Sequence, residues 1–439
     1  LEQGLYENYK QFSWTKNNLV LIVINKPIFR ACDIIASDNS NGKGIFVVKG
    51  NNTFIENIEF QNCKVKSGNG AGIRQEGSNL IVRHCIFNGN EMGLLQGGTI
   101  PDCKIVVEHC VFMNNGNSEN PGYQHNIYIN HIDTLIFRYN FTFDAVDEGH
   151  ELKSRASNNY ILYNRISNYN SSDSRNIDLP NGGRAIIMGN IIEQGENSSN
   201  SNIIGFGLEG LVNSPPHNLW ICSNTIVNKK NKGSFVNIAN IDTLFMKNNI
   251  CVGAKTGGFI IGNALMLDTS YNFIDNNIIS PIFLDVSQGD YHLNTGSPAI
   301  DAGVDLNEFA LGIKIYPEYE YKDTSMFVLR AKYGTIDLGA FEYELQSDIV
   351  EQIDLGNSEL LVYPNPAINS ANIFYKTESS EVLIQIVDYL GRVVECCLMQ
   401  IDVSENRIFI NTKNLVRGVY YLRVQDKNKV FSEVLFVNN

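Results

Sequence analysis

Short segments in which apolar and polar residues alternate recur along much of the chain. Each segment alternates up to one central residue and then resumes with Ile or Phe, as in FIENIEF, IVVEHCVF, IIMGNII and WICSNTI. Alternation of this kind over a few residues predicts half-buried β-strands separated by a tight bend. The central residues lie about 25 residues apart, with one longer interval, and are Asn57, His84, His109, Asn140, Asn164, Asn190, Asn224 and Asn249.

This interval is the length of one coil in a β-helix, where each short strand stacks on its equivalent one coil later. It does not fit the blades of a propeller. We therefore predict an all-β chain that begins as a right-handed parallel β-helix and ends in a small antiparallel β-sandwich. We interpret the recurring Asn as scaffold, because Asn tolerates a left-handed bend and stacked Asn side chains can hydrogen-bond along the helix axis.

The repeat fades after Cys251, and two phrases follow it, DYHLNTGSPAIDAG at 290–303 and IDLGAFEY at 336–343. They resemble the terminal segment of secreted right-handed β-helix proteins. The resemblance implies a cap that covers the apolar edge of the last coil. The β-helix domain is thus predicted at 1–343, and the cap forms its part from about 252 onward.

A different pattern follows an acidic stretch without aromatic residues at 344–360, which we interpret as a linker. Residues 361–439 alternate as strands with turn residues between them, which is typical of a β-sandwich. Their motifs are Tyr363-Pro364-Asn365-Pro366-Ala367, then Asp388 with Gly391-Arg392, then Leu415, Arg417-Gly418-Val419-Tyr420 and Leu422.

In type and order these motifs resemble the type IX secretion C-terminal sorting domain of the Bacteroidota. The resemblance implies that the type IX machinery is a partner of this domain. It also implies a protein that is secreted or held at the outer-membrane surface of such a bacterium. A generic sugar-binding sandwich is the alternative.

Composition and charge narrow the partners further. The net charge of -13 argues against a nucleic-acid partner, because binding to phosphates requires a basic surface. No apolar run approaches the roughly 20 residues that span a bilayer. The nine cysteines form no CxxC pair, so neither a zinc site nor a disulfide framework is predicted. We expect a monomer, and the opening LEQGLYEN reads as the end of a coil that begins before Leu1.

One region, residues 144–184, is basic in an otherwise acidic chain and predicts an acidic polysaccharide as ligand. Lys153 and Arg175 are 22 residues apart, slightly less than one coil. We therefore expect them on neighbouring coils of one face, roughly 5 to 10 Å apart. The candidate substrate-binding residues are His150, Arg155, Arg184, Tyr128 and Asp178.

The motifs Lys153-Ser154, Asn158-Asn159 and Arg175 resemble those of the chondroitinase B and alginate lyase family of β-helix polysaccharide lyases. The resemblance implies that Lys153 is the base that takes the C5 proton of a uronic acid. It implies that Arg175 assists or protonates the leaving oxygen. The chemistry requires a cation beside the substrate carboxylate, because only then is the C5 proton acidic enough to remove.

The same family holds a calcium ion with acidic residues just before the lysine. Glu148 lies five residues before Lys153, as one such ligand would, while Val146 stands at the place of a second acid and Asp144 and Asp147 lie nearby. Either these three acids contribute to the six to eight oxygens that calcium takes, or the basic residues neutralise the substrate carboxylate without a metal. No other cofactor is expected.

Three functions remain open on this scaffold, because a fold does not by itself define a function. The first is a polysaccharide lyase that cleaves a uronic-acid polymer by β-elimination. The second is a non-catalytic surface protein or adhesin that binds glycans. The third is a glycoside hydrolase, which would need two carboxylates across a cleft, drawn from Asp173, Asp178, Glu193 and Glu209.

Overall fold

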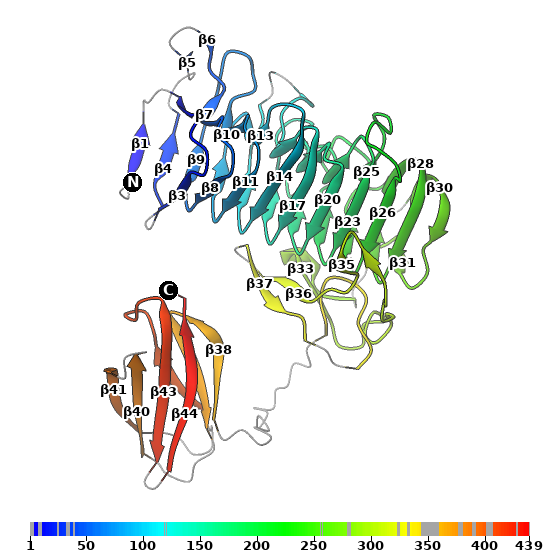
Figure 1. The fold of residues 1–439 in the computed structure, drawn as a ribbon. Coiled ribbons are helices and arrows are strands. Elements are labelled where there is room, and N and C mark those ends of the chain that lie inside the picture. Colours follow the sequence, from blue (N-terminus) through cyan, green and yellow to red (C-terminus); the bar gives the residue numbers. More distant parts are fainter. Residues whose placement is uncertain are drawn as a thin grey trace. The chain divides into compact units, whose positions relative to one another are not determined.

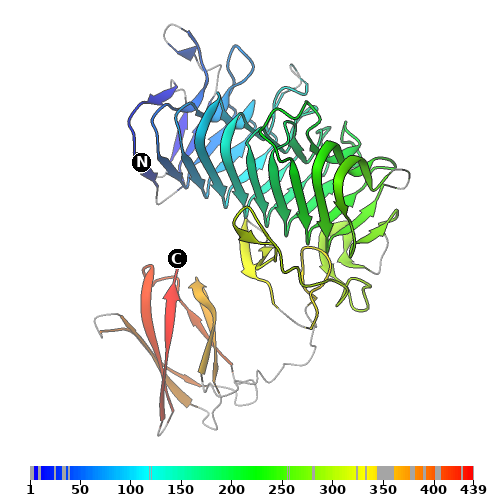
Figure 2. The ribbon, with the colours of Figure 1, turned by 45° about the vertical axis from the view of Figure 1, so that its right-hand side comes forward.

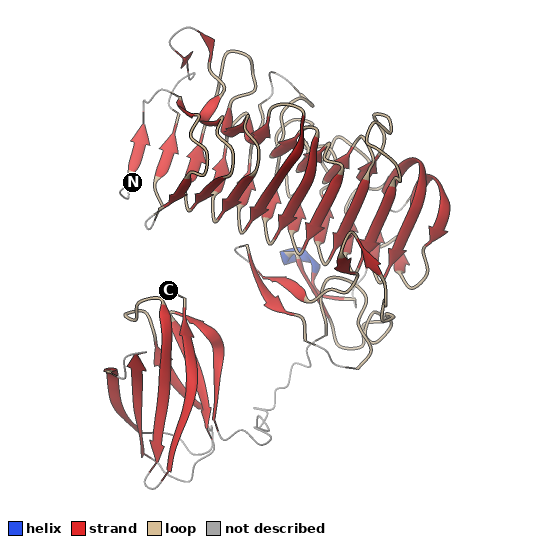
Figure 3. Ribbon diagram, viewed as in Figure 1, coloured by secondary structure: helices blue, strands red, loops and turns tan. Residues whose placement is uncertain are grey.

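The structure of the chain is a computed structural model with two compact units, Leu1–Glu344 and Leu345–Asn439. Almost all of its regular structure is β-strand (Figure 3). The structure describes residues 4–7, 11–23, 26–31, 36–37, 40–117, 119, 121–254, 256, 258–278, 282–322, 325–331, 334–343, 360–375, 381–388, 392–400, 407–426 and 429–438. The predicted linker lies outside the described residues except for Leu360, and so does Gly391 of the sorting motif.

The first unit is a parallel β-helix of about ten coils, each with three faces (Figures 1 and 2). Face 1 consists of β2 (Phe12–Trp14), β7 (Gly44–Val48), β10 (Ala71–Gln75), β13 (Met92–Gln96), β16 (Ile127–Ile129), β19 (Leu152–Ser154), β22 (Ile177–Leu179) and β25 (Asn202–Phe206). Face 2 consists of β3 (Val20–Ile22), β8 (Thr53–Glu56), β11 (Leu80–Arg83), β14 (Ile100–Glu108), β17 (Ile132–Arg138), β20 (Asn158–Leu162), β23 (Arg184–Met188) and β26 (Asn218–Cys222).

Two long strands, β28 (Ser234–Lys247) and β30 (Ile260–Asp268), run through both of these faces in the last two coils. Face 3 is an 11-stranded sheet, formed by β1 (Leu5–Glu7), β4 (Ile28–Arg30), β9 (Glu59–Gln61), β12 (Ile86–Asn88), β15 (Val111–Met113), β18 (Phe141–Phe143), β21 (Arg165–Ser167), β24 (Ile191–Gln194), β27 (Thr225–Asn228), β29 (Ile250–Gly253) and β31 (Phe273–Asp275). A short hairpin of β5 (Ala36–Ser37) and β6 (Ser40–Asn41) lies outside the coils.

The alternation in the sequence places one apolar column from each face inside the helix. On face 3 the column contains Phe60, Phe87 and Phe112, which are fully buried. Their rings stack with centroid distances of 5.2 and 4.5 Å between successive coils. Burial of one such side chain contributes about 1.5 to 3 kcal/mol. The repeat therefore stabilises the fold coil by coil.

The bend between faces 2 and 3 carries a ladder of buried asparagines, as predicted. Each Nδ2 donates to the Oδ1 of the next coil, at 2.9 to 3.1 Å, through Asn140, Asn164, Asn190, Asn224, Asn249 and Asn272. In two earlier coils Cys85 and Cys110 take this position, and the Cys110 amide donates to Asn140.

The sequence alignment of the repeats, which matched His84 and His109 with the recurring Asn, was wrong by one residue in these two coils. The left-handed residue is the one before the ladder, with φ of 52° at His84, 57° at His109, 58° at Tyr139 and 55° at Tyr163. These four rings stack along the outside, with centroid distances of 4.8, 5.1 and 5.7 Å. The central His84 and His109 are therefore equivalent to the tyrosines and not to the ladder asparagines.

The segment after the last coil was expected to cover its open end, and the structure differs. It forms β32 (Phe283–Asp285), the 3-10 turn η1 (Val286–Gln288), β33 (Asp290–Leu293), β34 (Phe309–Ala310), β35 (Ile313–Lys314), β36 (Tyr319–Lys322) and β37 (Met326–Leu329). Its apolar side chains pack beside Ile191, Val227 and Ile250 on the outside of face 3. Leu265 and Met266 of β30 remain 86% and 68% exposed.

The second unit is a small β-sandwich whose strands pair antiparallel within two groups. One group is β38 (Leu360–Ile368), β39 (Ser370–Tyr375) and β42 (Arg407–Asn411). The other is β40 (Glu381–Asp388), β41 (Val393–Gln400), β43 (Gly418–Asp426) and β44 (Lys429–Val437). A parallel bridge between Ala367 and Val437 joins them, around a core of residues such as Ile373, Ile384 and Leu422.

Candidate functional site

The strand register of face 1 aligns one outward-facing residue from each coil in a row parallel to the helix axis. Adjacent strands pair Arg74 with Leu95, Leu95 with Tyr128, Tyr128 with Lys153, Lys153 with Asp178, and Asp178 with Gly205. We call these six residues the face-1 row. Because parallel strands lie about 4.8 Å apart, each position of the row is within reach of its neighbour.

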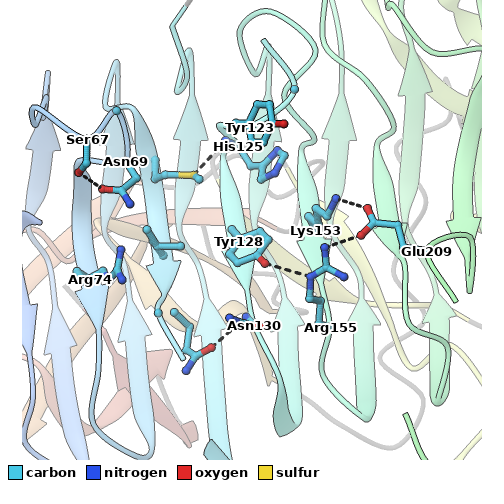
Figure 4. A pocket seen from close by; sticks show the side chains of 16 residues that line it. Ser67, Asn69, Arg74, Tyr123, His125, Tyr128, Asn130, Lys153, Arg155 and Glu209 are labelled. Carbon is cyan, nitrogen blue, oxygen red and sulfur yellow. Dashed lines mark hydrogen bonds and ion pairs between the residues drawn. The ribbon is translucent and has the colours of Figure 1, made fainter. Parts of the chain in front are cut away.

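An open groove of about 670 Å³ lies over the first four positions of this row, from Arg74 to Lys153 (Figure 4). Asp178 and Gly205 lie beyond its end, and His150 and Arg175 are not among its lining residues either. Both ends of the groove carry cations, Arg74 at one and Lys153 with Arg155 at the other. Between them lie aromatic, apolar and amide side chains, among them Tyr123, His125, Tyr128, Leu95 and Asn130. A groove of this size, with cations at both ends, can hold an elongated ligand that carries anionic groups.

Lys153 occupies the centre of the charged end of the groove. Its Nζ lies 2.7 Å from Oε1 of Glu209 and 3.4 Å from Oδ2 of Asp178. The side chain is only 10% exposed, so the groove presents little more than its ammonium group. The two ion pairs fix the position of the ammonium group at the end of the groove.

Arg155 follows two residues later on the same side of the strand and binds the same glutamate. Its Nη2 donates to Oε2 of Glu209 at 2.6 Å, its Nη1 to Oδ1 of Asn181 at 2.6 Å, and its Nε to the Tyr128 hydroxyl at 3.0 Å. Burial alone would raise the pKa of the Glu209 carboxyl, but its hydrogen bonds to Lys153 and Arg155 lower that pKa to about 2. Glu209 is therefore an anion bridging two cations of the groove.

Asp178 is the residue on which the predicted cations converge. Its Oδ1 lies 3.2 Å from Nη1 of Arg175, and its Oδ2 lies 3.4 Å from Nζ of Lys153 and 3.5 Å from Nε2 of His150. Burial raises the pKa of the Asp178 carboxyl, although Lys153 and Arg175 act in the opposite direction. A buried carboxylate with a raised pKa next to a lysine can exchange a proton with it.

Two stacked imidazoles border this cluster. His125 and His150 lie on neighbouring coils with ring centroids 5.0 Å apart. The Nδ1 of His125 accepts the backbone N–H of His150, and the Nδ1 of His150 accepts that of Arg175, at 3.0 and 3.1 Å. Burial, with the nearby cation Lys153, lowers the pKa of both imidazoles well below its usual value. In the neutral form each ring therefore carries its proton on Nε2.

The sequence did not indicate three residues of this site, which are Gly205, Glu209 and Arg74. A Cβ on Gly205 would meet Cδ and Nε of Arg175 and Oδ1 of Asp178. The missing side chain thus leaves the space in which Arg175 reaches Asp178. Glu209 was considered only as a hydrolase acid, and Arg74 was not considered. The one available signal for Glu209 was the long interval between Asn190 and Asn224, in which it lies.

Arg184 does not join the other predicted residues. It begins β23 on face 2, where it pairs with Asn158 and Asn218. It does not line the groove. A turn at Pro180 to Gly183 separates it from β22, so the chain has changed face before it reaches Arg184.

The acids proposed for calcium lie in the loop before β19. Oδ1 of Asp144 accepts the amides of Tyr169 and Asn170, and Oδ1 of Asp147 accepts the Ser172 hydroxyl. Within the described part of the chain, no three His, Cys, Asp or Glu side chains gather in a group that could hold a metal ion. Asp144, Asp147 and Glu148 therefore form no such group with their side chains, and calcium binding in this loop stays a prediction.

The other two hydrolase acids are buried and point away from the groove lining. Glu193 accepts the Tyr291 hydroxyl at 2.8 Å and pairs with Lys229. Asp173 is fully buried, and burial, together with the negative charge of Glu151, raises the pKa of its carboxyl well above the usual value. Neither Glu193 nor Asp173 lines the groove.

Comparison with known proteins identifies the second unit. Residues 361–438 match the family described as the secretion system C-terminal sorting domain. The chain is therefore a type IX secretion substrate and is a secreted or cell-surface protein. No curated protein and no solved structure matches the chain. Among the described residues, no helix is long and apolar enough to cross a membrane.

Proposed function

We propose that the face-1 groove binds a uronic-acid polysaccharide and cleaves it by β-elimination, with Lys153 as base. The observation that carries this proposal is the convergence of Lys153, Arg175 and His150 on Asp178 beside an open groove. In a chain with a net charge of -13, the cations gathered here, Lys153, Arg155 and Arg175, favour an acidic ligand. The protein would act outside the cell, on a polymer that its bacterium, a member of the Bacteroidota, meets there.

The proposed reaction begins when the carboxylate of the substrate replaces Glu209 on Arg155. Lys153 must then lose a proton, and Asp178, with its raised pKa, accepts it. The neutral Nζ removes the C5 proton of the uronic acid. The electron pair of that C–H bond forms the C4–C5 double bond, the glycosidic C4–O bond breaks, and a solvent molecule protonates the leaving oxygen, whose negative charge Arg175 would stabilise.

The test is the ultraviolet absorbance of the unsaturated product. Wild type and Lys153→Ala are incubated with alginate, polygalacturonate, chondroitin and dermatan sulfates and glucuronan, with and without calcium. We expect absorbance to rise on one polymer with wild type and to stay flat with the variant. Equal rates in the two proteins, or no rise on any polymer, would reject the elimination. A rise only with calcium would support the calcium prediction.

A second candidate, a surface protein that binds the glycan without cleaving it, is favoured by one observation. Lys153 Nζ forms ion pairs with both Glu209 and Asp178. A lysine paired in this way can bind the carboxylate of a sugar through charge-assisted hydrogen bonds without acting as a base. Binding of an acidic polymer that Lys153→Ala weakens, without any unsaturated product, would identify this function.

A further inference from the structure

Arg74 stands at the end of the groove away from Lys153, and nothing in the proposed reaction uses it. It belongs to the same face-1 row, three strands before Lys153, through the pairings of β10, β13, β16 and β19. Three steps between parallel strands amount to about 14 Å. Figure 4 shows the two residues over the same stretch of sheet, with Tyr128 between them.

The guanidinium of Arg74 is held in place but poorly paired. Its side chain is 14% exposed and lies over Gly97, where any Cβ would clash with Nε. The buried Nε has no hydrogen-bond partner among the described residues. The carboxylate paired with it, Glu76, is 3.6 Å away and also binds Lys43. Burial lowers the pKa of Arg74, and Glu76 opposes this only in part.

Arg74 lines the groove, and its ion pair with Glu76 is long, at 3.6 Å. A guanidinium placed in this way can bind an anion that enters the groove, because charge-assisted hydrogen bonds to carboxylates are strong. The residues between Arg74 and Lys153 carry no charge, since Leu95 and Tyr128 fill the two intervening positions of the row. They offer apolar and aromatic surface for sugar rings. The groove thus has two cationic ends separated by a neutral floor.

We propose that Arg74 is a second anion-binding subsite, which holds a carboxylate of the same polymer three units away from the one at Lys153 and Arg155. This inference rests on the proposed function. A pyranose unit in an extended chain is about as long as one strand spacing, so three strand steps correspond to three sugar units. The ligand is then a polyuronate that lies along the helix axis, and four units are the shortest length that reaches both subsites.

The experiment measures affinity as a function of ligand length by calorimetry on the full chain. The probes are oligomers of two to six units prepared from polygalacturonate, from alginate and from glucuronan. For wild type we expect the affinity for one series to rise steeply between three and four units. Arg74→Gln should bind the longer oligomers about tenfold more weakly and the shorter ones unchanged.

Two further variants separate charge from structure. Arg184→Gln makes the same change on face 2, outside the groove, and should leave every affinity unchanged. Arg74→Lys keeps the charge and should retain most of the rise between three and four units. If a folded Arg74→Lys protein binds as weakly as Arg74→Gln, the charge is not the cause and the subsite is rejected.

The two proposals fail in different ways. Wild type that binds oligomers with no dependence on length beyond two units, or an Arg74→Gln variant that binds all lengths as wild type does, overturns the second subsite alone. Wild type that binds none of the three series overturns the subsite and the proposed function together. Cleavage without the length step leaves the function standing and removes the subsite.

Discussion

The asparagine ladder and the face-1 row are built by the same repeat, yet they differ in how their residues are paired. In the ladder the same residue recurs in six successive coils, and each side chain bonds its equivalent in the next. In the row every coil contributes a different residue, from Arg74 through Leu95, Tyr128 and Lys153 to Asp178. The ladder, in which one residue type recurs, stabilises the coils. The face-1 row, in which each coil contributes a different residue, can bind a ligand.

The largest expected effect tests the row. Asp178→Asn keeps the shape of the side chain but removes the proposed proton acceptor of Lys153, so cleavage should fall by roughly 10²- to 10⁴-fold. Initial rates on the polymer that wild type cleaves provide the measurement. Asp173→Asn is the matched control, because this acid is also buried but lies outside the face-1 row and forms no ion pair with Lys153. Equal losses in both variants would show that burial of a carboxyl, and not its place in the row, matters.

The next effect tests the ladder. Asn190→Ala removes the buried hydrogen bonds between the Asn190 side chain and Asn164 and Asn224 and leaves the backbone N–H of Asn164 without its acceptor, which should cost about 2 to 3 kcal/mol of unfolding free energy. Urea denaturation measures this cost, and cleavage per folded molecule should stay unchanged. Asn263→Ala, which removes an exposed hydrogen bond to Asn240, should change stability by less than about 0.5 kcal/mol. A similar loss in the two variants would contradict a special role for the ladder.

The pH dependence of stability tests the two buried histidines beside the face-1 row. The pKa of His125 and His150 is lowered in the folded protein, so below pH 6.5 each binds fewer protons in the folded chain than in the unfolded one. The contribution of each histidine to stability should therefore fall with decreasing pH, by up to about 1.4 kcal/mol per pH unit, whereas Glu151, whose pKa is raised by burial to about 8, acts in the opposite direction. Thermal unfolding of wild type and His125→Gln between pH 7.5 and 5.5 isolates the histidine contribution. His125→Gln should lose less stability on acidification than wild type, and the exposed His292→Gln should behave as wild type does.

The smallest effect concerns Glu209, the carboxylate that already binds the cations at one end of the groove. Glu209→Gln removes the carboxylate that competes with substrate for Lys153 and Arg155, so binding of an acidic oligomer should tighten about fivefold. In acid, the stabilisation that Glu209 supplies above its usual pKa of 4.5 is lost as the pH falls toward 2, and the variant should lack this dependence. Glu196→Gln, an exposed acid outside the groove, is the control. Weaker binding in Glu209→Gln would mean that Glu209 holds the ligand instead.

The periodicity of the sequence was sufficient to predict the β-helix, and the motifs from Tyr363 to Leu422 were sufficient to predict the sorting domain. The first signal is repeated in successive coils, and the second consists of several local motifs in a fixed order. The spacing of Lys153 and Arg175 correctly placed them on neighbouring coils, where they contact one carboxylate. What the spacing could not give was the identity of that carboxylate.

The missed residues share a physical reason. Glu209 reaches Lys153 from a loop 56 residues later, and Arg74 shares its groove across three coils. Such contacts depend on the length of each coil, and coil lengths vary with the loops between strands. Arg184 was misplaced for the same reason, because a short turn moves the chain from face 1 to face 2. The left-handed residue was expected at the Asn because Asn adopts that conformation more readily than Tyr, whereas in the structure the bend falls on the residue before it and the Asn side chain forms the ladder.

The in-register pairing of face 1 also bears on how such a groove can change over evolutionary time. Duplication of one complete coil would lengthen the groove by a single strand spacing and leave the pairing of all other coils intact. Insertion of one residue inside a strand would turn its side chains to the opposite face. The length of ligand that such a groove accommodates can therefore change by whole coils, whereas its chemical preference changes by substitution of single outward-facing residues.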